Sequence, residues 1–333
     1  MSVHIVINRQ ARHLDDESPV RRALLAEAER HGAAVHETRS LAELGRIAEG
    51  IAEGRASAVV LAGGDGSHMA GVSALARVFA AGAMPPLALA PGGTVGVVAR
   101  NLAAGHGAAR DRAATLVRAV CEGTARPTST PTLRVRDDAG GDHVAFIFGA
   151  GLVARFFDVY DAAPRQGVGP AAVLAARAFF GSLVGSPFAR RMLSPVACAL
   201  RVDGALQPSR AWSLLLASVV PDVGLGVRAT YRAGQEPDRF HVIASARSPR
   251  GLAAQVPRVL AGRAMTGAGH VDTLARRLEV TFEGGQGGQG GPGDDSGATY
   301  VLDGDALRAR QVAVEAGPVV SLLVAGERHE GRS

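Results

Sequence analysis

A glycine-rich turn after an apolar run is the first segment of the sequence whose residue types suit chemistry. Residues 58–62 are apolar, residues 63–67 read Gly-Gly-Asp-Gly-Ser, and a helical pattern begins near His68. Glycines in a strand-to-helix turn let backbone N–H groups approach a phosphate, and the helix dipole favours the negative charge. Asp65 would then face the phosphates with a magnesium ion between them. The turn predicts a phosphate site with magnesium at Asp65.

A second turn of the same kind follows about 25 residues later. The apolar run 87–90 leads into Pro-Gly-Gly-Thr at 91–94 and then into another helical pattern. Neighbouring strand ends that both carry such turns define one crevice at the carboxyl edge of an α/β sheet. Thr94 alone reads equally well as a helix N-cap, but the pairing of the two turns favours a donor to phosphate.

All 36 basic residues are arginines, because the sequence contains no lysine. P-loops, pyridoxal Schiff bases and protein-kinase ATP sites, which all need a lysine amine, are therefore excluded. Phosphate chemistry must rely on backbone amides, arginines or a metal. The ten histidines lack the spacing of a zinc site. His68, at a helix start, is expected to cap the helix or to lie on the surface.

Short apolar runs alternate with helical patterns in the first 120 residues, which is typical of βα units around a parallel sheet. From about residue 132 the pattern changes to short strands joined by turn signals, which predicts a mostly antiparallel, sandwich-like second domain. The strands expected in the first part of the chain lie at 3–7, 34–38, 58–62 and 87–90. Helices are expected from Ser18-Pro19 to Gly32 and from Leu41 to Gly54, and a further helix is expected near 249–263 in the second part.

Asp-Gly pairs occur between expected strands at 203–204 and at 303–304. Asp-Gly is a strong two-residue hairpin signal, because both positions of the turn take positive φ. From the residues alone, Asp203 and Asp303 are both turn residues.

The order of these features resembles the diacylglycerol kinase catalytic superfamily, which includes soluble bacterial lipid kinases and the sphingosine and ceramide kinases. Residues 63–67 resemble its GGDGT motif, residues 91–94 its PxGT motif, and Asp-Gly-Asp at 303–305 its DGE motif. An opening strand that ends in Asn8, a threonine at Thr38 and a glycine turn at 148–151 extend the resemblance over most of the chain.

The resemblance implies an α/β fold with two domains. Residues 1–128 would form a Rossmann-like three-layer nucleotide domain of the NAD kinase/diacylglycerol kinase type. Residues 129–318 would form a β-sandwich domain for the lipid substrate, with a mobile loop at 284–297 whose composition is nearly all Gly, Gln, Pro, Asp and Ser. A strand within 319–333 would return to the first domain before a tail.

The resemblance also implies a kinase that uses ATP and Mg²⁺ to phosphorylate a lipid hydroxyl, diacylglycerol-like or sphingoid, with ATP in the interdomain cleft. Asp303 would accept the proton of that hydroxyl, and Asp65 would act with it in catalysis and bind magnesium. The nucleotide-binding residues implied are Asn8, Thr38, Gly63, Gly64, Asp65, Gly66, Ser67, Gly92, Gly93, Thr94 and Arg100.

The sequence departs from the superfamily where magnesium is normally supported. The family continues its second motif as GTxNDFAR, whereas residues 93–100 read Gly-Thr-Val-Gly-Val-Val-Ala-Arg. Thr128 stands where an aspartate is common, NPxSG is reduced to Asn-Arg-Gln-Ala at 8–11, and Asp305 replaces the DGE glutamate. Either Asp65, water and nucleotide hold the ion, or the protein is a catalytically weakened nucleotide- or lipid-binding homologue. NAD kinase, which shares GGDGT, is less favoured because no matching Asn-Glu motif is present.

Charge and composition bear on partners and location. The net charge of +5 permits an anionic partner, but no aromatic-interleaved basic patch indicates nucleic acid. We expect a membrane lipid substrate with peripheral contact to an anionic membrane, and a homodimer is left open. Two distant cysteines, Cys121 and Cys198, read as reduced, and no secretory leader precedes the first strand. The expected location is cytoplasmic, at the inner face of the membrane.

One apolar segment admits two interpretations. Residues 171–184 include Leu174, Phe179, Phe180 and Leu183 and are interrupted by Arg177. The segment would line a lipid access path or rest on a membrane. Ordinary packing of an apolar helix against a sheet explains it about equally well.

Overall fold

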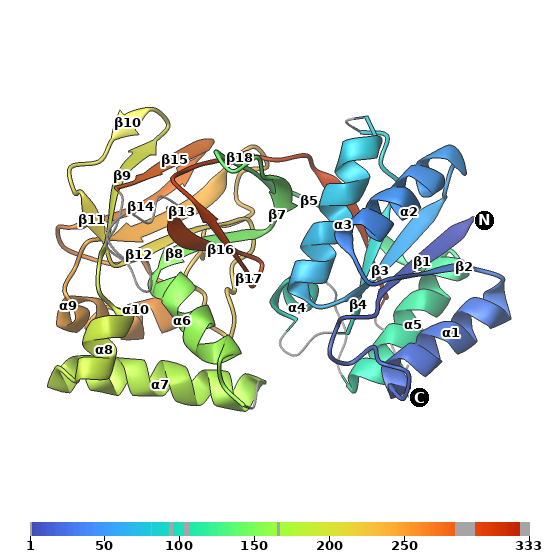
Figure 1. The fold of residues 1–333 in the computed structure, drawn as a ribbon, viewed down its shortest axis with the longest axis horizontal. Helices are drawn as coiled ribbons and strands as arrows, with labels where there is room; N and C mark the ends of the chain where they lie inside the picture. Colours follow the sequence, from blue (N-terminus) through green and yellow to red (C-terminus); the bar gives the residue numbers. More distant parts are fainter. Residues whose placement is uncertain are drawn as a thin grey trace, which may run out of the picture. The chain divides into compact units, whose positions relative to one another are not determined.

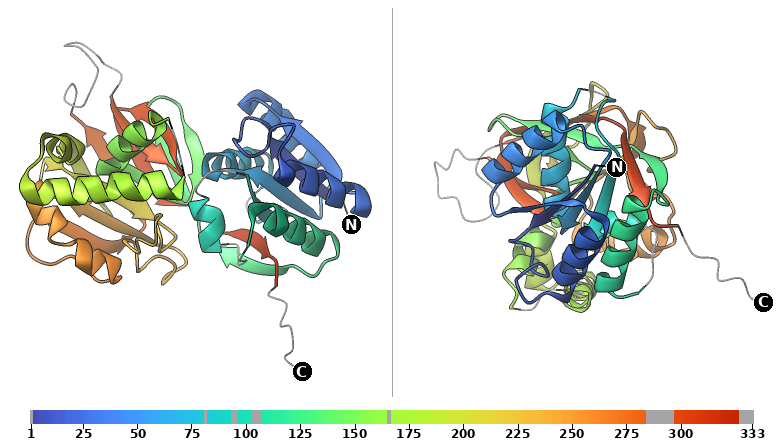
Figure 2. Two further views of the ribbon diagram at one scale, coloured as in Figure 1. Left: turned by 90° about the horizontal axis from the view of Figure 1, so that it is seen from below. Right: turned by 90° about the vertical axis from the view of Figure 1, so that its right-hand side faces the viewer.

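The computed structural model describes residues 2–80, 82–92, 96–102, 107–164, 167–283 and 297–326. The chain forms two compact units (Figures 1 and 2). Unit 1 comprises residues 1–130 and 318–333, and unit 2 comprises residues 131–317. Gly93, Thr94 and residues 284–296 of the expected mobile loop lie outside the described residues.

Unit 1 is an α/β domain in which strands and helices alternate. Its strands are β1 (Val3–Asn8), β2 (Ala34–Thr38), β3 (Ala58–Gly63), β4 (Leu87–Pro91), β5 (Arg126–Thr130) and β19 (Val320–Val324), and its helices are α1 (Pro19–His31), α2 (Leu41–Glu53), α3 (Asp65–Val78), α4 (Val97–Leu102) and α5 (Ala109–Cys121).

The strands of unit 1 form one sheet in the order β2-β1-β3-β4-β19-β5. Strands β1 to β4 are parallel, β19 pairs parallel with β4, and β5 pairs antiparallel with β19. The last strand of the chain therefore lies between two strands from its first 130 residues. This mainly parallel sheet with its helices confirms the fold class predicted for the first domain.

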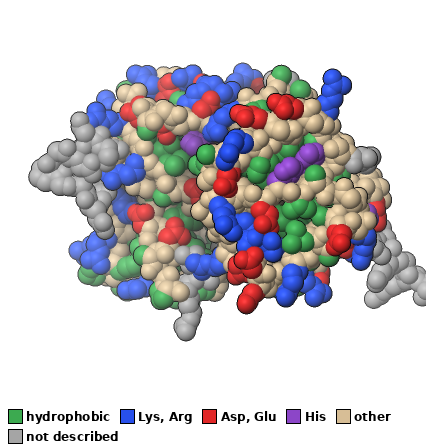
Figure 3. Space-filling model, turned by 45° about the vertical axis from the view of Figure 1, so that its right-hand side comes forward, with side chains coloured by type: hydrophobic (Ala, Val, Ile, Leu, Met, Phe, Trp, Pro, Cys, Tyr) green, Lys and Arg blue, Asp and Glu red, His purple; other side chains and the backbone are tan. Residues whose placement is uncertain are grey.

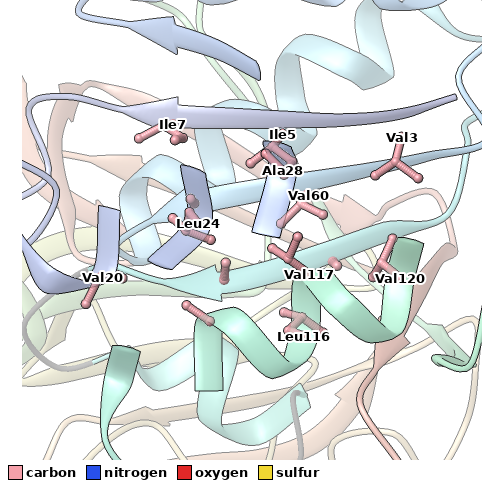
Figure 4. Close-up of a cluster of buried hydrophobic side chains, with 14 of the residues drawn as sticks. Val3, Ile5, Ile7, Val20, Leu24, Ala28, Val60, Leu116, Val117 and Val120 are labelled. Carbon is pink, nitrogen blue, oxygen red and sulfur yellow. The ribbon is translucent and has the colours of Figure 1, made fainter. Parts of the chain in front are cut away.

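The core of unit 1 lies between one face of the sheet and the helices α1 and α5. Ile5 and Val60 point from β1 and β3 toward Leu24 of α1 and Val117 of α5 (Figure 4). All four side chains are fully buried. Burial of each contributes about 1.5–3 kcal/mol, which fixes these strands against the helices. Helices α2 and α3 cover the other face (Figure 1).

The ends of α1 follow the predicted signals. The hydroxyl of Ser18 accepts hydrogen bonds from the N–H groups of Val20 and Arg21, at 3.1 and 3.2 Å. Gly32 closes the helix in the left-handed conformation with φ of 66°. A serine cap followed by proline, and a glycine stop, are thus confirmed as the boundaries of this helix.

We expect Gly50→Ala to raise the free energy of unfolding by about 0.4–1 kcal/mol. Gly50 lies inside α2, and a Cβ atom there would have no atom within 4 Å. Alanine restricts the unfolded chain without a clash in the folded one. Urea denaturation followed by circular dichroism measures the change, and a lower stability would contradict the open surroundings of this residue.

Unit 2 contains mostly short strands with a group of helices. Its strands are β6 (Leu133–Asp137), β7 (Asp142–Ala145), β8 (Ile147–Gly151), β9 (Val196–Val202), β10 (Ala205–Leu206), β11 (Ala211–Trp212), β12 (Leu214–Ser218), β13 (Phe240–Ser245), β14 (His270–Ala275), β15 (Arg277–Phe282), β16 (Ala298–Leu302), β17 (Asp305–Ala309) and β18 (Gln311–Ala316), and its helices are α6 (Leu152–Asp161), α7 (Val168–Val184), α8 (Pro187–Met192), α9 (Pro249–Ala253) and α10 (Val256–Leu260).

Two antiparallel sheets organise unit 2, as predicted for a β-sandwich. One sheet has the order β10-β9-β15-β18-β6-β7, with β11 beside β9, and the other has the order β14-β13-β12-β8-β16-β17. Strands of the first sheet alternate buried and more exposed residues, whereas β12 and β13 of the second are buried almost throughout. A sheet that is buried on both faces needs other elements packed on its second face as well as on its first. Helices α6, α8 and α9 supply it, packing on side chains such as Leu216 and Ile243.

Three sharp corners carry the chain from one sheet to the other. A single residue separates the two strands at each corner: Phe146 between β7 and β8, Arg276 between β14 and β15, and Arg310 between β17 and β18. Chain segments that switch sheets in this way leave backbone amides without ladder partners. An aspartate from a nearby hairpin bonds those amides at each corner.

The three aspartates make the same contacts. Asp203 Oδ1 accepts the N–H groups of Arg276 and Arg277 at 2.9 and 2.8 Å. Asp138 Oδ1 accepts those of Arg310 and Gln311 at 3.0 and 3.1 Å. Each aspartate also donates its own N–H to the carbonyl of the residue that follows the corner residue, namely Gln311, Arg277 or Ile147. We refer to Asp138, Asp203 and Asp303 as the corner aspartates, and the contacts of Asp303 are given with the site below.

Several elements differ from the sequence prediction. The helix expected at 249–263 is two short helices, α9 and α10, and the glycine turn expected at 148–151 belongs to strand β8. The helix expected after residues 91–94 is the short helix α4, whereas the sequence pattern did not indicate α5, α6 or α8, because α6 and α8 are short and α5 begins without a side-chain cap. Both cysteines are free, as expected. None of the described helices has the length and apolar character needed to cross a membrane.

Candidate active site

The carboxyl ends of β1 to β4 lie at one edge of the unit 1 sheet. Asn8 is in register with Thr38, and Gly63 is in register with Pro91. Because these strands are parallel, the segments that follow them meet at the same edge. The structure thus brings together the predicted site residues at 8, 38, 63–67 and 92.

The two glycine turns are in direct contact. The N–H of Gly92 donates to the carbonyl of Gly63 at 2.8 Å. A Cβ atom on Gly63 would lie 2.3 Å from Cβ of Ser67, and one on Gly92 would lie 2.5 Å from Cδ1 of Leu14. Both positions therefore require glycine for packing, in addition to any approach of a phosphate.

The first turn of α3 is open to an anion. Its N-cap is Gly64, and among the described residues no side chain bonds the N-terminal amides of this 14-residue helix. Amides at a helix N-terminus attract a phosphate when no side chain caps them. Ser67, one turn into the helix, accepts a hydrogen bond from Asn8 Nδ2 at 2.8 Å, which ties the end of β1 to this turn.

The carboxylate of Asp65 caps α4. Its Oδ2 accepts the N–H of Val97 at 2.7 Å, and its Oδ1 accepts that of Val98 at 2.9 Å. Burial raises the pKa of Asp65 above its ordinary value, while His68, the two amides and Arg100 act in the opposite direction. The metal and catalytic roles of Asp65 stay predictions. The capping role was not indicated by the sequence.

His68 is a buried structural residue, which makes the expected capping or surface role wrong. Its side chain is fully buried, and Nε2 lies 3.1 Å from the carbonyl oxygen of Ala90. Burial lowers the pKa of His68, so the ring is neutral near pH 7 and can donate from Nε2. The contact holds the start of α3 against β4.

A pocket adjoins the phosphate-type turn. Its apolar wall includes Leu44 of α2 and Leu61 of β3, and its polar groups include Asn8, Thr38 and Ser67. Thr38 Oγ1 donates to the carbonyl of Ser40 at 2.9 Å, which orders the turn into α2. Asn8, Thr38 and Ser67 were among the predicted site residues, whereas Gln10 and Ser40, which also line the pocket, were not. The apolar wall was missed because Leu44 read only as part of a helix pattern and Leu61 only as part of a strand.

Arg100 and Arg9 differ in how they are held. Arg100, a predicted nucleotide ligand, is exposed on α4, and its Nε lies 3.4 Å from the carbonyl of Gly96. Arg9, which was not predicted, has a side chain only 9% exposed and bonds Asp16 and Glu37 at 2.6 and 2.9 Å. Only Arg100 is placed to meet a ligand from solvent.

The described residues do not provide a magnesium site. None of them form a group of three His, Cys, Asp or Glu side chains able to hold an ion. Both oxygens of Asp65 accept amide N–H groups, one from Val97 and one from Val98. Magnesium requires several oxygen ligands in octahedral geometry. The donor set does not fit the ion in this arrangement.

Asp303, the predicted base, lies in the β16–β17 hairpin of unit 2. Its φ is 47° and that of Gly304 is 97°, which fits the two-residue turn predicted from Asp-Gly. Its side chain is the buried one among the corner aspartates, 4% exposed. The N–H of Phe146 lies 3.2 and 3.0 Å from its two oxygens, and that of Ile147 donates to Oδ1 at 2.8 Å. The role as base stays a prediction beside this structural one.

Comparison with protein families bears on the same edge of the sheet. Residues 2–132 match the family model of the diacylglycerol kinase catalytic domain. The match spans less than half of the chain. The match contains both glycine turns and ends where unit 1 passes into unit 2. The resemblance seen in the sequence is confirmed over these residues.

Solved structures resemble nearly the whole chain. Two proteins from Bacillus anthracis str. Sterne, provisionally assigned as diacylglycerol kinases, are 14% and 13% identical, with TM-scores of 0.67 and 0.66. The alignments cover 97% of this chain in both cases, and 96% and 97% of those chains. A diacylglycerol kinase of the same organism is 12% identical with a TM-score of 0.60, and the alignment covers 97% and 96% of the two chains. These likenesses concern the fold. A search of curated proteins found no match.

Proposed function

We propose that the protein is a lipid kinase that transfers the γ-phosphate of ATP to the hydroxyl of a membrane lipid, diacylglycerol-like or sphingoid. The observation that carries the proposal is the pair of glycine turns, joined by the bond from Gly92 to Gly63, beside the uncapped start of α3 within the matched catalytic domain. Backbone amides at this place suit the phosphates of a nucleotide in a chain without lysine.

The pocket beside the turn is assigned to the rest of the nucleotide. Its apolar wall suits an aromatic base, and Asn8, Thr38 and Ser67 offer hydrogen bonds to a sugar or base. Arg100, exposed on α4, is proposed to neutralise phosphate charge.

In the proposed reaction the lipid hydroxyl oxygen forms a bond to the γ-phosphorus as the bond to the leaving ADP oxygen breaks. The hydroxyl proton passes to the carboxylate of Asp303, as the family resemblance implies. No step is assigned to magnesium, because the described residues do not fit it.

The test is incubation of the protein with γ-labelled ATP and mixed micelles of diacylglycerol, sphingoid bases or ceramide, with and without magnesium. We expect label in the lipid fraction with one lipid class. Absence of label from every lipid under both conditions would overturn the enzyme proposal.

We expect Asp65→Ala to reduce transfer and Asp65→Asn to retain most of it. Alanine leaves the first amides of α4 without their acceptor, at a cost of about 1 kcal/mol, whereas asparagine is a good cap. Initial rates in the same assay measure the difference. If the two variants lose activity equally, the charge of Asp65 is needed. Its role is then the one that the family resemblance implies, in catalysis and magnesium binding.

A second candidate is a nucleotide-binding homologue without catalysis. It is favoured by the start of α4, where Val97 bonds Asp65 through its backbone amide. A valine side chain at this position cannot support a magnesium ion. Titration calorimetry separates the two functions, because nucleotide binding that is insensitive to magnesium, without turnover on any lipid, is expected only of the second.

A further inference from the structure

The outer helix of unit 2 has an apolar face that nothing covers among the described residues. On α7, Val173, Phe180, Leu183 and Val184 are 69%, 64%, 46% and 77% exposed. The buried residues of this helix, such as Ala171 and Ala178, face the other way. Its inner side packs on α6, α8 and α9, and it lies at the margin of unit 2 (Figure 1).

This face differs from that of an ordinary surface helix. A helix packed on one side normally presents polar or charged residues to water on the other. Here the outward residues are valine, phenylalanine, leucine and alanine, with Arg177 as the one charged side chain of α7. Core packing does not explain them, because the fold would be kept with polar residues at these positions. Of the two interpretations of the segment, exposure favours the surface role.

Arginines accompany this face on α7 and on its neighbours α8 and α9. No aspartate or glutamate occurs from residue 162 to 202 or from residue 239 to 271, and these two stretches supply α7, α8, α9 and α10. The exposed arginines on or directly after these helices are Arg177, Arg190, Arg191, Arg250 and Arg263, whereas the exposed Arg201 of the first stretch lies on β9. Within the described part of the chain, none of these five forms an ion pair with a carboxylate.

Many arginines elsewhere in the protein form ion pairs with carboxylates. In unit 1, arginines and carboxylates are interspersed (Figure 3), as in the ion pairs of Arg9 with Asp16 and of Arg21 with Glu37. Arg134 and Arg277 of unit 2 likewise pair with Asp142 and Glu279. What distinguishes the α7–α10 stretches is the combination of exposed arginines outside ion pairs with the exposed apolar side chains of α7.

We propose that the exposed face of α7, with the arginines of α7 to α10, binds the surface of an anionic lipid bilayer. We name this surface the basic apolar face. Apolar side chains enter the boundary between headgroups and acyl chains, while guanidinium groups pair with the phosphates. A nucleic acid would match the charge but would leave phenylalanine and valines without partners. The observations do not depend on catalysis, although the proposed lipid acceptor fits the same surface.

The experiment is sedimentation of the full-length protein with vesicles of phosphatidylcholine alone or mixed with phosphatidylglycerol, without nucleotide. We expect binding to the anionic vesicles that weakens with salt, and little binding to the neutral ones. Because no ATP or acceptor lipid is present, failure here is distinct from failure of the kinase assay.

Two variants with matched controls locate the binding. Arg190→Ala with Arg191→Ala is expected to lower the partition coefficient about 30-fold, because each arginine near such a surface contributes about 1 kcal/mol. The control, Arg201→Ala with Arg210→Ala, removes the same charge from exposed positions on another edge of unit 2. It is expected to change the partition coefficient less than threefold. Val184→Asp should reduce binding at least tenfold, and Leu206→Asp, at a 45% exposed leucine of β10, should not.

Several results would overturn the proposal. These are equal loss in variants and controls, no binding to anionic vesicles, or tight binding of single-stranded DNA that Val184→Asp leaves unchanged. Each side chain replaced is exposed, and thermal unfolding verifies that the variants fold.

Discussion

Asp303→Ala is expected to lower the free energy of unfolding of unit 2 by about 3 kcal/mol. The buried carboxylate accepts the amides of Phe146 and Ile147, and each amide left buried without an acceptor costs about 1–3 kcal/mol. Trp212, the single tryptophan, is buried in unit 2, so its fluorescence during urea denaturation reports on this unit.

Asp203→Ala is the matched control. Asp203 makes the same pair of contacts at another corner but is exposed, so water replaces the lost acceptor. We expect a loss of about 1 kcal/mol or less. Equal losses at the two positions would show that burial does not set the importance of the corner aspartates.

Asp303→Asn separates structure from catalysis at this residue. The amide oxygen of asparagine can still accept an N–H, so the variant should fold at moderate temperature. As a base in the proposed reaction, Asp303 should contribute about 10²–10⁴-fold to the rate, which asparagine abolishes. Transfer by the folded variant at the wild-type rate would leave Asp303 with its corner role alone.

Gly63→Ala is expected to reduce phosphoryl transfer at least 100-fold and to destabilise unit 1 by about 1–3 kcal/mol. The new Cβ would lie 2.3 Å from Cβ of Ser67, a distance that only a shift of the start of α3 relieves. That shift moves the amides proposed to hold the phosphates. Gly63 also bonds Gly92, so the second turn would move with it.

Circular dichroism and initial rates measure the two effects of this substitution. Gly50→Ala provides the control, because the same replacement in the open surroundings of α2 should leave activity unchanged. Trp212 fluorescence should report an unaltered transition for unit 2. Normal transfer by Gly63→Ala would mean that the turn does not position the reacting phosphates.

The sequence predicted best where a local rule decides the structure. Ser18 and Gly32 bound a helix because a cap and a left-handed glycine are required at its ends, and the two glycine turns follow strands whose parallel order places them together. The positions of Asn8 and Ser67 relative to each other followed from the same order.

The features that were missed depend on partners distant in sequence. The hydrogen bonds of Asp65 with amides 32 and 33 residues further along were not predicted, and its role toward phosphate stays a prediction. His68 was expected to cap the helix or to lie on the surface, but it is buried and contacts Ala90 of β4. The corner contacts of Asp303 join residues 156 and 157 positions apart, which no turn signal encodes.

The place of β19 has a consequence for synthesis of the chain. Strand β5 is joined to the unit 1 sheet only through β19, which emerges from the ribosome after all of unit 2. Because the ribosome adds about 5–20 residues per second, the edge of β4 stays unpaired for roughly 10–40 s before β19 is made. The segment matched to the kinase family is therefore made first and completed last. Expressed without residues 318–326, it would present an unpaired strand edge to neighbouring chains.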